Sequence, residues 1–253
     1  MPIQWVITGI RVRSFPFRVV NMKKINDPEA LRSLMDQHRI SGLFNMGTEA
    51  AMELYSFDKG ENVCSVDDPI DHLFMLVKGK IKIYRVLPNG KSILIRFYNP
   101  LSTIGDLEML NDLTARSTVE SVNDTIFIGI HRQALEETAY QDPAFLRFVM
   151  KHLAYKLHTF SNASSLNLLY PVETRFASYL VSITMDDNDQ AQIEEIKTGK
   201  LTEIAEMLGT SYRHLNRVIS QFAEEGIVER TRGSLFVKDI QRLKQLANGN
   251  LYS

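Results

Sequence analysis

Near the C-terminal end of the chain, polar, basic and aromatic side chains crowd into the segment "LGTSYRHLNRVISQF", residues 208–222. Arginine can bond guanine O6 and N7 with both arms of its guanidinium, and asparagine can pair with adenine N6 and N7. Tyrosine and histidine can donate to backbone phosphates. These residue types therefore predict contact with double-stranded DNA, through Tyr212, Arg213, His214, Asn216 and Arg217.

The spacing around this cluster predicts a helix-turn-helix. In "LTEIAEMLGTSYRHLNRV", residues 201–218, the small Ala205 lets two helices cross closely and Gly209 can take the positive φ of a tight turn. Thr202 is a candidate cap for the first helix, and Thr210 or Ser211 for the second, which we expect over residues 211–224. Apolar residues at helical spacing would close the small core: Leu201, Ile204, Leu208, Leu215 and Val218.

Downstream, "IVERTRGSLFVKD", residues 227–239, predicts two short strands around Arg232-Gly233, which would form a basic wing beside the second helix. The alternative is an ordinary helical hairpin with a solvated polar face. Residues 171–253 favour that alternative in one respect, because they hold slightly more acidic than basic residues. Spacing and wing together favour DNA binding, with these predicted contacts: Thr202, Ser211, Tyr212, Arg213, His214, Asn216, Arg217 and Arg232.

Upstream, residues 54–130 contain short β-type runs separated by Gly, Pro, Asn and Asp. "LFMLVKGKIKIYRVL", residues 73–87, alternates around Gly79, which predicts a first hairpin there. "PNG", residues 88–90, separates this run from "KSILIRFY" and predicts a second hairpin. Antiparallel strands at this spacing indicate a sandwich, barrel or jelly roll.

Apolar residues then recur at steps of three and four, at Phe145, Val149, Leu153, Leu157 and Phe160. They predict a helix of about seven turns. Its apolar seam could pack against the β module of the same chain or form a coiled-coil dimer, and its length favours the dimer. A break at Tyr170-Pro171 predicts a hinge.

Composition points to a soluble globular protein of two modules. The chain has 253 residues, of which 44% are hydrophobic and 23% charged, and no stretch is apolar enough to span a membrane. The single Cys64 excludes an internal disulfide framework, and a reducing cytosol fits it best. Met22 opens a segment in which Asp27 can cap a helix, so we interpret residues 1–21 as a leader or extension outside the functional protein.

The order of a β module, a long helix and a winged helix-turn-helix resembles the Crp/Fnr superfamily of transcription regulators. The motifs that carry the resemblance are "FDKGENV", "DHLFMLVKGKIKIYRV", "IGDLEMLNDLTARSTVES" and residues 201–228, where "GTSYRHL" is similar to the YeiL-type branch. It implies an α+β fold with an N-terminal jelly roll of the cyclic-nucleotide-binding kind at residues 22–135, a dimerisation helix at 136–170 and a DNA-binding domain at 171–253. It also implies a homodimer on a two-fold symmetric site, with RNA polymerase as a further candidate partner.

The resemblance implies an effector pocket, with Gly105, Asp106, Arg116, Ser117, Phe160 and Ser161 at the matching positions. In the cyclic-nucleotide-binding members, a glutamate accepts the ribose hydroxyl, an arginine holds the phosphate and a Thr-Ser pair contacts the base. Here Asp106 is one methylene shorter than glutamate, and Phe160 replaces the threonine. We therefore favour another ligand, or an empty pocket in which Arg116 pairs with Asp106 or Glu108, over cyclic AMP.

Two other classes of function are alternatives to DNA binding. A metal-dependent enzyme needs clustered ligands, whereas His72 and His131 are isolated in the sequence, so we expect no metal site and no catalysis. Haem on one of these histidines stays open, and one cysteine cannot hold an iron–sulfur cluster. The remaining alternative is a cyclic-nucleotide-sensing regulatory protein that acts through a protein partner.

Overall fold

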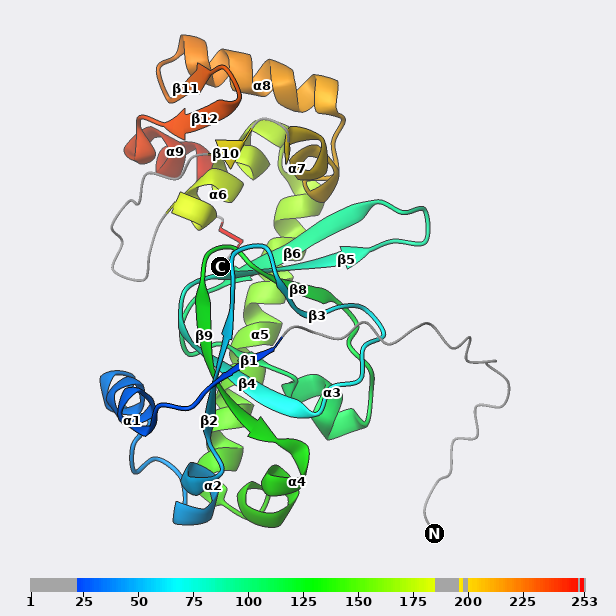
Figure 1. Cartoon of the computed structure of the whole chain (residues 1–253). Helices are drawn as coiled ribbons and strands as arrows, with labels where there is room; N and C mark the ends of the chain where they lie inside the picture. The colour runs from blue at the N-terminus through cyan, green and yellow to red at the C-terminus, as the bar shows by residue number, and fades with distance from the viewer. Residues whose placement is uncertain (1–21, 185–195, 198–199, 250, 253) are drawn as a thin grey trace, which may run out of the picture.

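The computed structural model describes residues 22–184, 196–197, 200–249 and 251–252, and the predicted leader at 1–21 lies outside these ranges. A β-roll forms one end of the molecule, a compact helical unit forms the other, and a long helix runs beside the roll and joins the two (Figure 1). The α+β prediction is confirmed. Among the described residues, no helix is long and apolar enough to cross a membrane.

The roll consists of two antiparallel sheets. One has the strand order β1-β2-β9-β4-β7 and the other the order β3-β8-β5-β6. Apolar side chains of both sheets face inward, and Leu76, Ile81 and Phe127 are fully buried between them. The strands are β1 Lys23–Ile25, β2 Glu53–Phe57, β3 Asn62–Cys64, β4 His72–Lys78, β5 Ile81–Val86, β6 Ser92–Tyr98, β7 Thr103–Ile104, β8 Thr118–Ser121 and β9 Thr125–His131.

The first predicted hairpin is wrong, although the turn at Gly79 exists. β4 pairs with β7 and β9, whereas β5 pairs with β6 and β8, so the chain passes from one sheet to the other at this turn. Gly79 has a φ of +89°, and a Cβ there would lie 2.5 Å from the carbonyl oxygen of Asp124. Glycine is required at this crossing point. The second hairpin, between β5 and β6, is confirmed.

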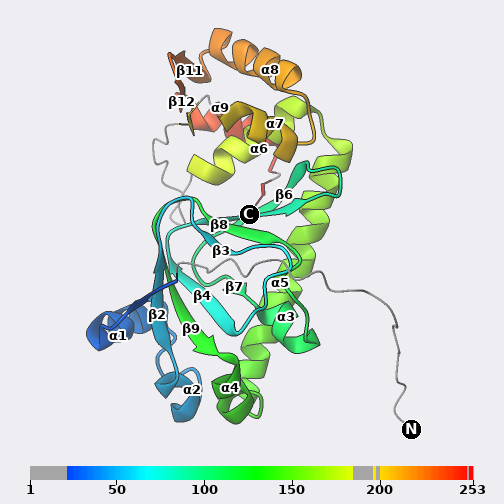
Figure 2. The same ribbon diagram turned by 45° about the vertical axis from the view of Figure 1, so that its right-hand side comes forward.

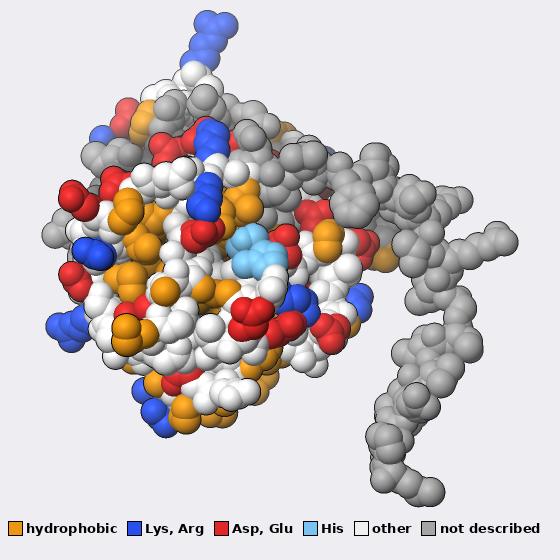
Figure 3. Space-filling view, turned by 60° about the horizontal axis from the view of Figure 1, so that its bottom comes forward, with side chains coloured by type: hydrophobic (Ala, Val, Ile, Leu, Met, Phe, Trp, Pro, Cys, Tyr) orange, Lys and Arg blue, Asp and Glu red, His pale blue; other side chains and the backbone are white. Residues whose placement is uncertain are grey.

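Short helices close the lower end of the roll (Figure 1). Their bounds are α1 Pro28–Gln37, α2 Met46–Ala50 and α4 Arg132–Ala134, and a π-helical turn follows α4 at Leu135–Ala139. Asp27 caps α1 as predicted, because its side chain accepts from the backbone N–H of Ala30 at 2.9 Å. Seen from this end, hydrophobic side chains lie scattered among acidic and basic ones (Figure 3).

The long helix is α5, Pro143–Leu169, and its 27 residues match the predicted seven turns. It begins at Pro143 because Asp142 caps it. The predicted range began earlier, at residue 136, but residues 136–142 belong to the preceding π-helical turn and the loop after it. α5 runs along the roll from α4 to the C-terminal unit (Figure 2). It ends before Pro171, and α6, Val172–Thr184, follows, so the predicted break at Tyr170-Pro171 is present.

The C-terminal unit is a winged helix-turn-helix. α7, Leu201–Met207, and α8, Tyr212–Glu224, form the helix-turn-helix, and α6 and α9, Ile240–Ala247, complete the helical core. A small sheet of order β10-β12-β11 forms the wing, with strands β10 Ile196–Lys197, β11 Val228–Thr231 and β12 Ser234–Val237. Gly209 has a φ of +62° between α7 and α8, as predicted for the tight turn.

Candidate DNA interface and effector pocket

α8 is held at its start by a side-chain cap and along one face by packing. The hydroxyl of Ser211 accepts from the backbone N–H of His214 at 3.2 Å, which selects Ser211 over Thr210 as the cap. Leu215, Val218 and Phe222 are buried on the inner face. Because this inner face is buried in the core of the C-terminal unit, the opposite face of α8 is held toward solvent.

The outward face of α8 carries the predicted DNA contacts. Tyr212 is 46% exposed, and Arg213 and Arg217 are also exposed. Within the described part of the chain, neither arginine takes part in an ion pair. His214 is half-buried, with its Nε2 4.0 Å from a carboxylate oxygen of Glu173. The guanidinium groups of Arg213 and Arg217 can therefore donate hydrogen bonds to phosphate oxygens or to acceptors on base edges.

The wing adjoins α8 through a hydrogen bond. Arg230, in β11, donates from Nη1 to Oδ1 of Asn216 at 2.8 Å, which orients the Asn216 amide. Arg232 lies exposed at the turn between β11 and β12, next to Gly233 with its φ of +102°. The wing therefore brings two further arginines, Arg230 and Arg232, to the same end of the molecule as α8 (Figure 1).

Thr202 does not cap α7. Lys200 occupies the cap position with no side-chain bond, because α7 begins at Leu201, two residues earlier than a cap at Thr202 would require. Thr202 is exposed in the first turn of α7, where its hydroxyl remains accessible to a phosphate.

A second candidate site is a cavity of about 470 Å³ between the roll, α3 (Asp106–Asn111) and α5. Four of the six predicted effector residues line it: Gly105, Asp106, Ser117 and Phe160. Gly105 has a φ of +92°, and a Cβ there would lie 2.5 Å from the carbonyl oxygen of His72, so only glycine fits. The cavity has the size of ordinary small-molecule sites, about 300–1,000 Å³.

Arg116 and Ser161 do not line the cavity. The backbone of Ala115 is bonded on both sides to the loop at Asp67 and Asp68, which buries the Ala115 side chain and turns Arg116 outward to solvent. The predicted pairing of Arg116 with Asp106 or Glu108 is wrong, since Arg116 makes no ion pair with any described residue. Ser161 is exposed on α5.

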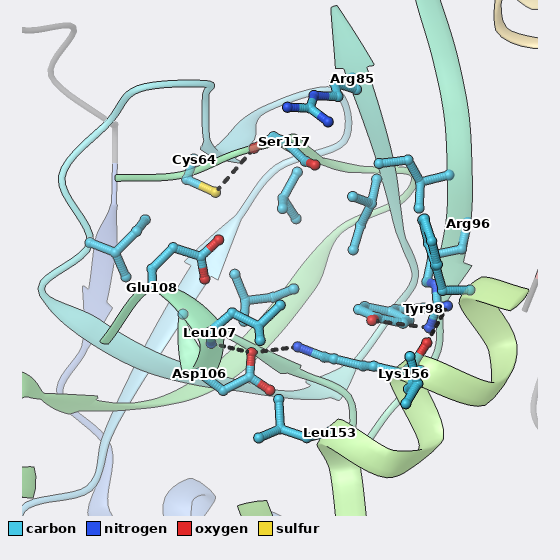
Figure 4. Close-up of a pocket in the computed structure, with 18 residues that line it drawn as sticks. Cys64, Arg85, Arg96, Tyr98, Asp106, Leu107, Glu108, Ser117, Leu153 and Lys156 are labelled. Carbon is cyan, nitrogen blue, oxygen red and sulfur yellow. Dashed lines mark hydrogen bonds and ion pairs between the residues drawn. The ribbon is translucent and has the colours of Figure 1, made fainter. Parts of the chain in front are cut away.

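Asp106 pairs instead with Lys156, a residue outside the predicted effector set. Lys156 Nζ lies 2.5 Å from Asp106 Oδ1 (Figure 4). Thr103 donates to the other carboxylate oxygen at 2.8 Å. The Asp106 side chain is 1% exposed and that of Lys156 is 15% exposed. Burial lowers the pKa of Lys156 below its usual value, and the neighbouring carboxylate offsets part of this effect.

Arg96 and Tyr98, both in β6, are also cavity residues that sequence reasoning missed. Arg96 donates to the Tyr98 hydroxyl at 3.2 Å and to the backbone carbonyl of Lys156 at 2.9 Å. Alternation in "KSILIRFY" gave no signal for them, because it places Arg96 and Tyr98 opposite the apolar Ile95 and Phe97, on the side that the pattern assigns to solvent. Burial raises the pKa of the Tyr98 hydroxyl to about 12.

Cys64 lines the same cavity and is 5% exposed. Burial raises the pKa of its thiol to about 12, so the thiol is protonated at neutral pH and a weak nucleophile. No group of three or more potential metal ligands occurs among the residues that the structure describes.

Comparison with protein-family models identifies both halves of the chain. Residues 54–142 match the cyclic nucleotide-binding domain, and residues 174–246 match the Crp-like helix-turn-helix domain. These two matches coincide with the roll that holds the cavity and with the unit that presents α8.

Similar curated proteins match most of the chain. Regulatory protein YeiL of Escherichia coli O157:H7 is 24% identical over 213 residues, which covers 84% of this chain and 94% of that protein. A CRP-like cAMP-activated global transcriptional regulator of Mycobacterium tuberculosis is 25% identical over 76% of this chain and 86% of its own length.

The fold is likewise shared with solved structures. A crystal structure of a putative transcriptional regulator of the Crp/Fnr family from Eubacterium rectale superposes with a TM-score of 0.66, at 17% identity, over 87% of this chain and 94% of that one. Taken with the family matches to both domains, the chain belongs to the Crp/Fnr family of transcription regulators.

Proposed function

We propose that the protein is a homodimeric, effector-controlled regulator that binds a two-fold symmetric operator through α8. The observation that carries this proposal is the outward face of α8, where Arg213 and Arg217 are exposed beside the basic wing. Members of this family are transcription regulators and not enzymes. Because DNA is the proposed partner, we place the protein in the cytoplasm.

Dimerisation is supported by an apolar stripe on α5. Leu146 is 38% exposed, Met150 59%, Leu157 73% and Leu168 83%, and their spacing puts them on one face of the helix together with Phe160. Exposed apolar residues at heptad-like spacing favour a parallel pairing with a second α5. Two copies of α8 would then face successive turns of the major groove, about 34 Å apart.

Effector control is supported by residues that the cavity and this stripe share. Leu157 and Phe160 line the cavity and belong to the exposed stripe, so a bound ligand would contact the proposed dimer seam directly. We propose that ligand binding shifts the packing of the two α5 helices about the break at Tyr170-Pro171 and thereby changes the separation of the two α8 helices.

The test is selection of binding sites from random DNA duplexes with the purified full-length protein, followed by titration at several salt concentrations. We expect a palindromic site and a steep decrease in affinity with salt, because each phosphate contact releases counterions. Failure to enrich any sequence, with and without candidate ligands, would favour the alternative in which the protein acts on a protein partner.

Substitution then assigns the individual DNA contacts. Arg213→Ala combined with Arg217→Ala should lower the affinity for the selected site by about 1–3 kcal/mol for each arginine that binds a base edge, or reduce the salt slope by about one for each that binds a phosphate. A matched control removes two exposed arginines elsewhere, Arg32→Ala in α1 with Arg242→Ala in α9. Equal decreases in affinity in the two double variants would contradict a specific role for α8.

Activation of transcription would need a contact with RNA polymerase. Run-off transcription on the selected operator, with and without the protein, distinguishes an activator from a repressor.

A further inference from the structure

The cavity holds a buried positive charge that no carboxylate balances. Arg96 is 3% exposed, and its two hydrogen bonds go to neutral acceptors, the Tyr98 hydroxyl and the backbone carbonyl of Lys156. Within the described residues, Arg96 forms no ion pair. A guanidinium is always charged and has five N–H donors, so Arg96 keeps both charge and donors for a further acceptor.

Asp106, a buried carboxylate that lines the same cavity, is already bonded to protein donors. Asp106 accepts from Lys156 Nζ at 2.5 Å and from the backbone N–H of Leu107 at 3.0 Å through Oδ1, and from Thr103 through Oδ2. Burial is the main cause that lowers the pKa of Lys156, and the positive charge of Arg96 lowers it further. Among the described residues of the cavity, Asp106 therefore balances Lys156 and leaves the charge of Arg96 without an anion. Burying an unbalanced charge is unfavourable unless an anionic partner binds it.

The rest of the cavity does not suit a nucleotide. Arg116, at the position of the phosphate-binding arginine, faces solvent, and the Asp106 oxygens are engaged by protein donors instead of being open to a ribose hydroxyl. The wall is largely aliphatic and includes Ile70, Ile83, Ile95, Ile104 and Leu153.

The charges in the cavity are also separated in space. Arg96 and Tyr98 lie on one side, beside α5, and Glu108 lies on the opposite side (Figure 4). A second anionic group placed toward Glu108 would be repelled. Arg85 lines the cavity as well, but it is exposed to solvent, so its charge is already stabilised by water.

We propose that this cavity binds a small apolar carboxylic acid, whose single carboxylate pairs with Arg96 and whose hydrocarbon body packs on the aliphatic wall. Tyr98 is a neutral phenol at physiological pH and can donate its proton to the same carboxylate. The inference rests on the proposed function, in which this cavity is the effector pocket. Because Arg96 also holds a backbone carbonyl of α5, such a ligand would bind at the helix that forms the proposed dimer seam.

Calorimetric titration of the full-length protein tests the ligand class with matched pairs of compounds. The probes are octanoate with octanamide, 4-phenylbutyrate with 4-phenylbutyramide, and cyclic AMP. We expect each carboxylate to bind roughly tenfold or more tightly than its amide, since hydrogen bonds to charged groups are the stronger ones. The proposal is overturned if neither carboxylate binds, if the amides bind equally well, or if cyclic AMP binds more tightly than both carboxylates.

Variants locate the charge that is recognised. Arg96→Met should abolish the preference for carboxylate over amide, whereas Arg116→Met, which removes an exposed arginine outside the cavity, should leave it unchanged. Arg96→Lys keeps the charge and should keep the preference with weaker binding. If Arg96→Met does not fold, the Arg96→Lys variant and the comparison of carboxylates with amides on the wild-type protein still test the proposal. A preference that survives in folded Arg96→Met would overturn the assignment.

DNA affinity, measured separately, distinguishes this inference from the proposed function. Carboxylate binding with no change in DNA affinity would support the ligand class and contradict effector control. Specific DNA binding in a protein that binds no carboxylate would support the proposed function and overturn the inference.

Discussion

At the scale of single residues, Asp106 and Lys156 form the central feature of the cavity. The shorter Asp106 side chain stays close to its own backbone, where Leu107 N–H and Thr103 bind it, and Lys156 reaches across from α5. The pair therefore ties the roll to α5 from inside. Removing one partner of a buried pair is costly because the other charge remains without compensation.

Lys156→Met tests the contribution of this pair to stability. We expect the free energy of unfolding to fall by about 3 kcal/mol, near the lower end for buried pairs because two donors to Asp106 remain. Urea denaturation at neutral pH measures the change. The double variant Lys156→Met with Asp106→Asn removes the charge as well and should recover part of the stability; a double variant no more stable than the single one would contradict the argument.

His152 gives a residue-scale prediction about pH. Burial lowers the pKa of His152 below 6.5, and the positive charge of Lys156 lowers it further, while Asp106 acts in the opposite direction. The unfolded chain therefore takes up the proton first as pH falls. The stability that depends on neutral His152 is complete above pH 6.5 and is lost as pH decreases through the lower, folded-state pKa.

His152→Leu should consequently reduce the loss of stability between about pH 7 and pH 5. Urea denaturation across this pH range measures the slope. His158→Leu is the matched control, because His158 is on the same helix and exposed. If both variants keep the wild-type slope, His152 does not titrate as described.

At the scale of elements, the apolar residues of α5 serve both alternatives that the sequence allowed: some pack against the β-roll of the same chain, and others are exposed and available for a dimer. Phe145 and Val149 are buried against the roll, so the first half of the predicted seam packs within the chain. Leu157 and Phe160, in the second half, are largely exposed. One helix thus packs one face against the roll near its start and exposes an apolar stripe on another face along its length.

Leu157→Glu tests that stripe. A charge in the middle of an apolar seam must be buried on pairing, so we expect dissociation of the dimer to monomers at micromolar concentration in sedimentation velocity. Met46→Glu is the control, since Met46 is 88% exposed and belongs to α2 instead of to the α5 stripe. A Leu157→Glu protein that sediments like the wild type would refute the α5 dimer.

At the scale of the whole molecule, the roll and the DNA-binding unit are in direct contact. Lys80 donates to the carbonyl of Ser182 in α6 at 2.7 Å, and Lys82 pairs with Glu203 in α7 at 3.1 Å. Tyr252 is 1% exposed, and its hydroxyl donates to the side chain of Asn167 in α5 at 2.7 Å. Its backbone carbonyl accepts from the backbone N–H of Phe97 in β6 at 2.5 Å. The C-terminal end therefore joins all three parts.

Tyr252→Ala should weaken the attachment of the C-terminal end more than removal of the hydroxyl alone. Deleting a buried aromatic ring costs about 3 kcal/mol or more, whereas Tyr252→Phe removes one hydrogen bond worth about 1 kcal/mol. Hydrogen exchange should show faster exchange in α6 and β6 for the alanine variant. Similar exchange rates in the two variants would mean that the ring does not hold the units together.

Local sequence determined the elements of this protein. Apolar periodicity, the caps at Asp27 and Ser211, and the positive-φ position at Gly209 predicted the helices and the helix-turn-helix, because these signals act within a few residues along the chain. The motif order likewise predicted the family. These parts depend on short-range geometry, which a single sequence contains.

Only the tertiary structure decided which side chains meet. It separated β4 and β5 into different sheets, turned Arg116 to solvent and paired Asp106 with Lys156, which is distant along the chain. Periodicity indicates which face of an element is apolar, but not what covers that face. The partner of a buried charge is set by long-range packing, since a carboxylate pairs with whichever cation the fold brings within hydrogen-bonding distance.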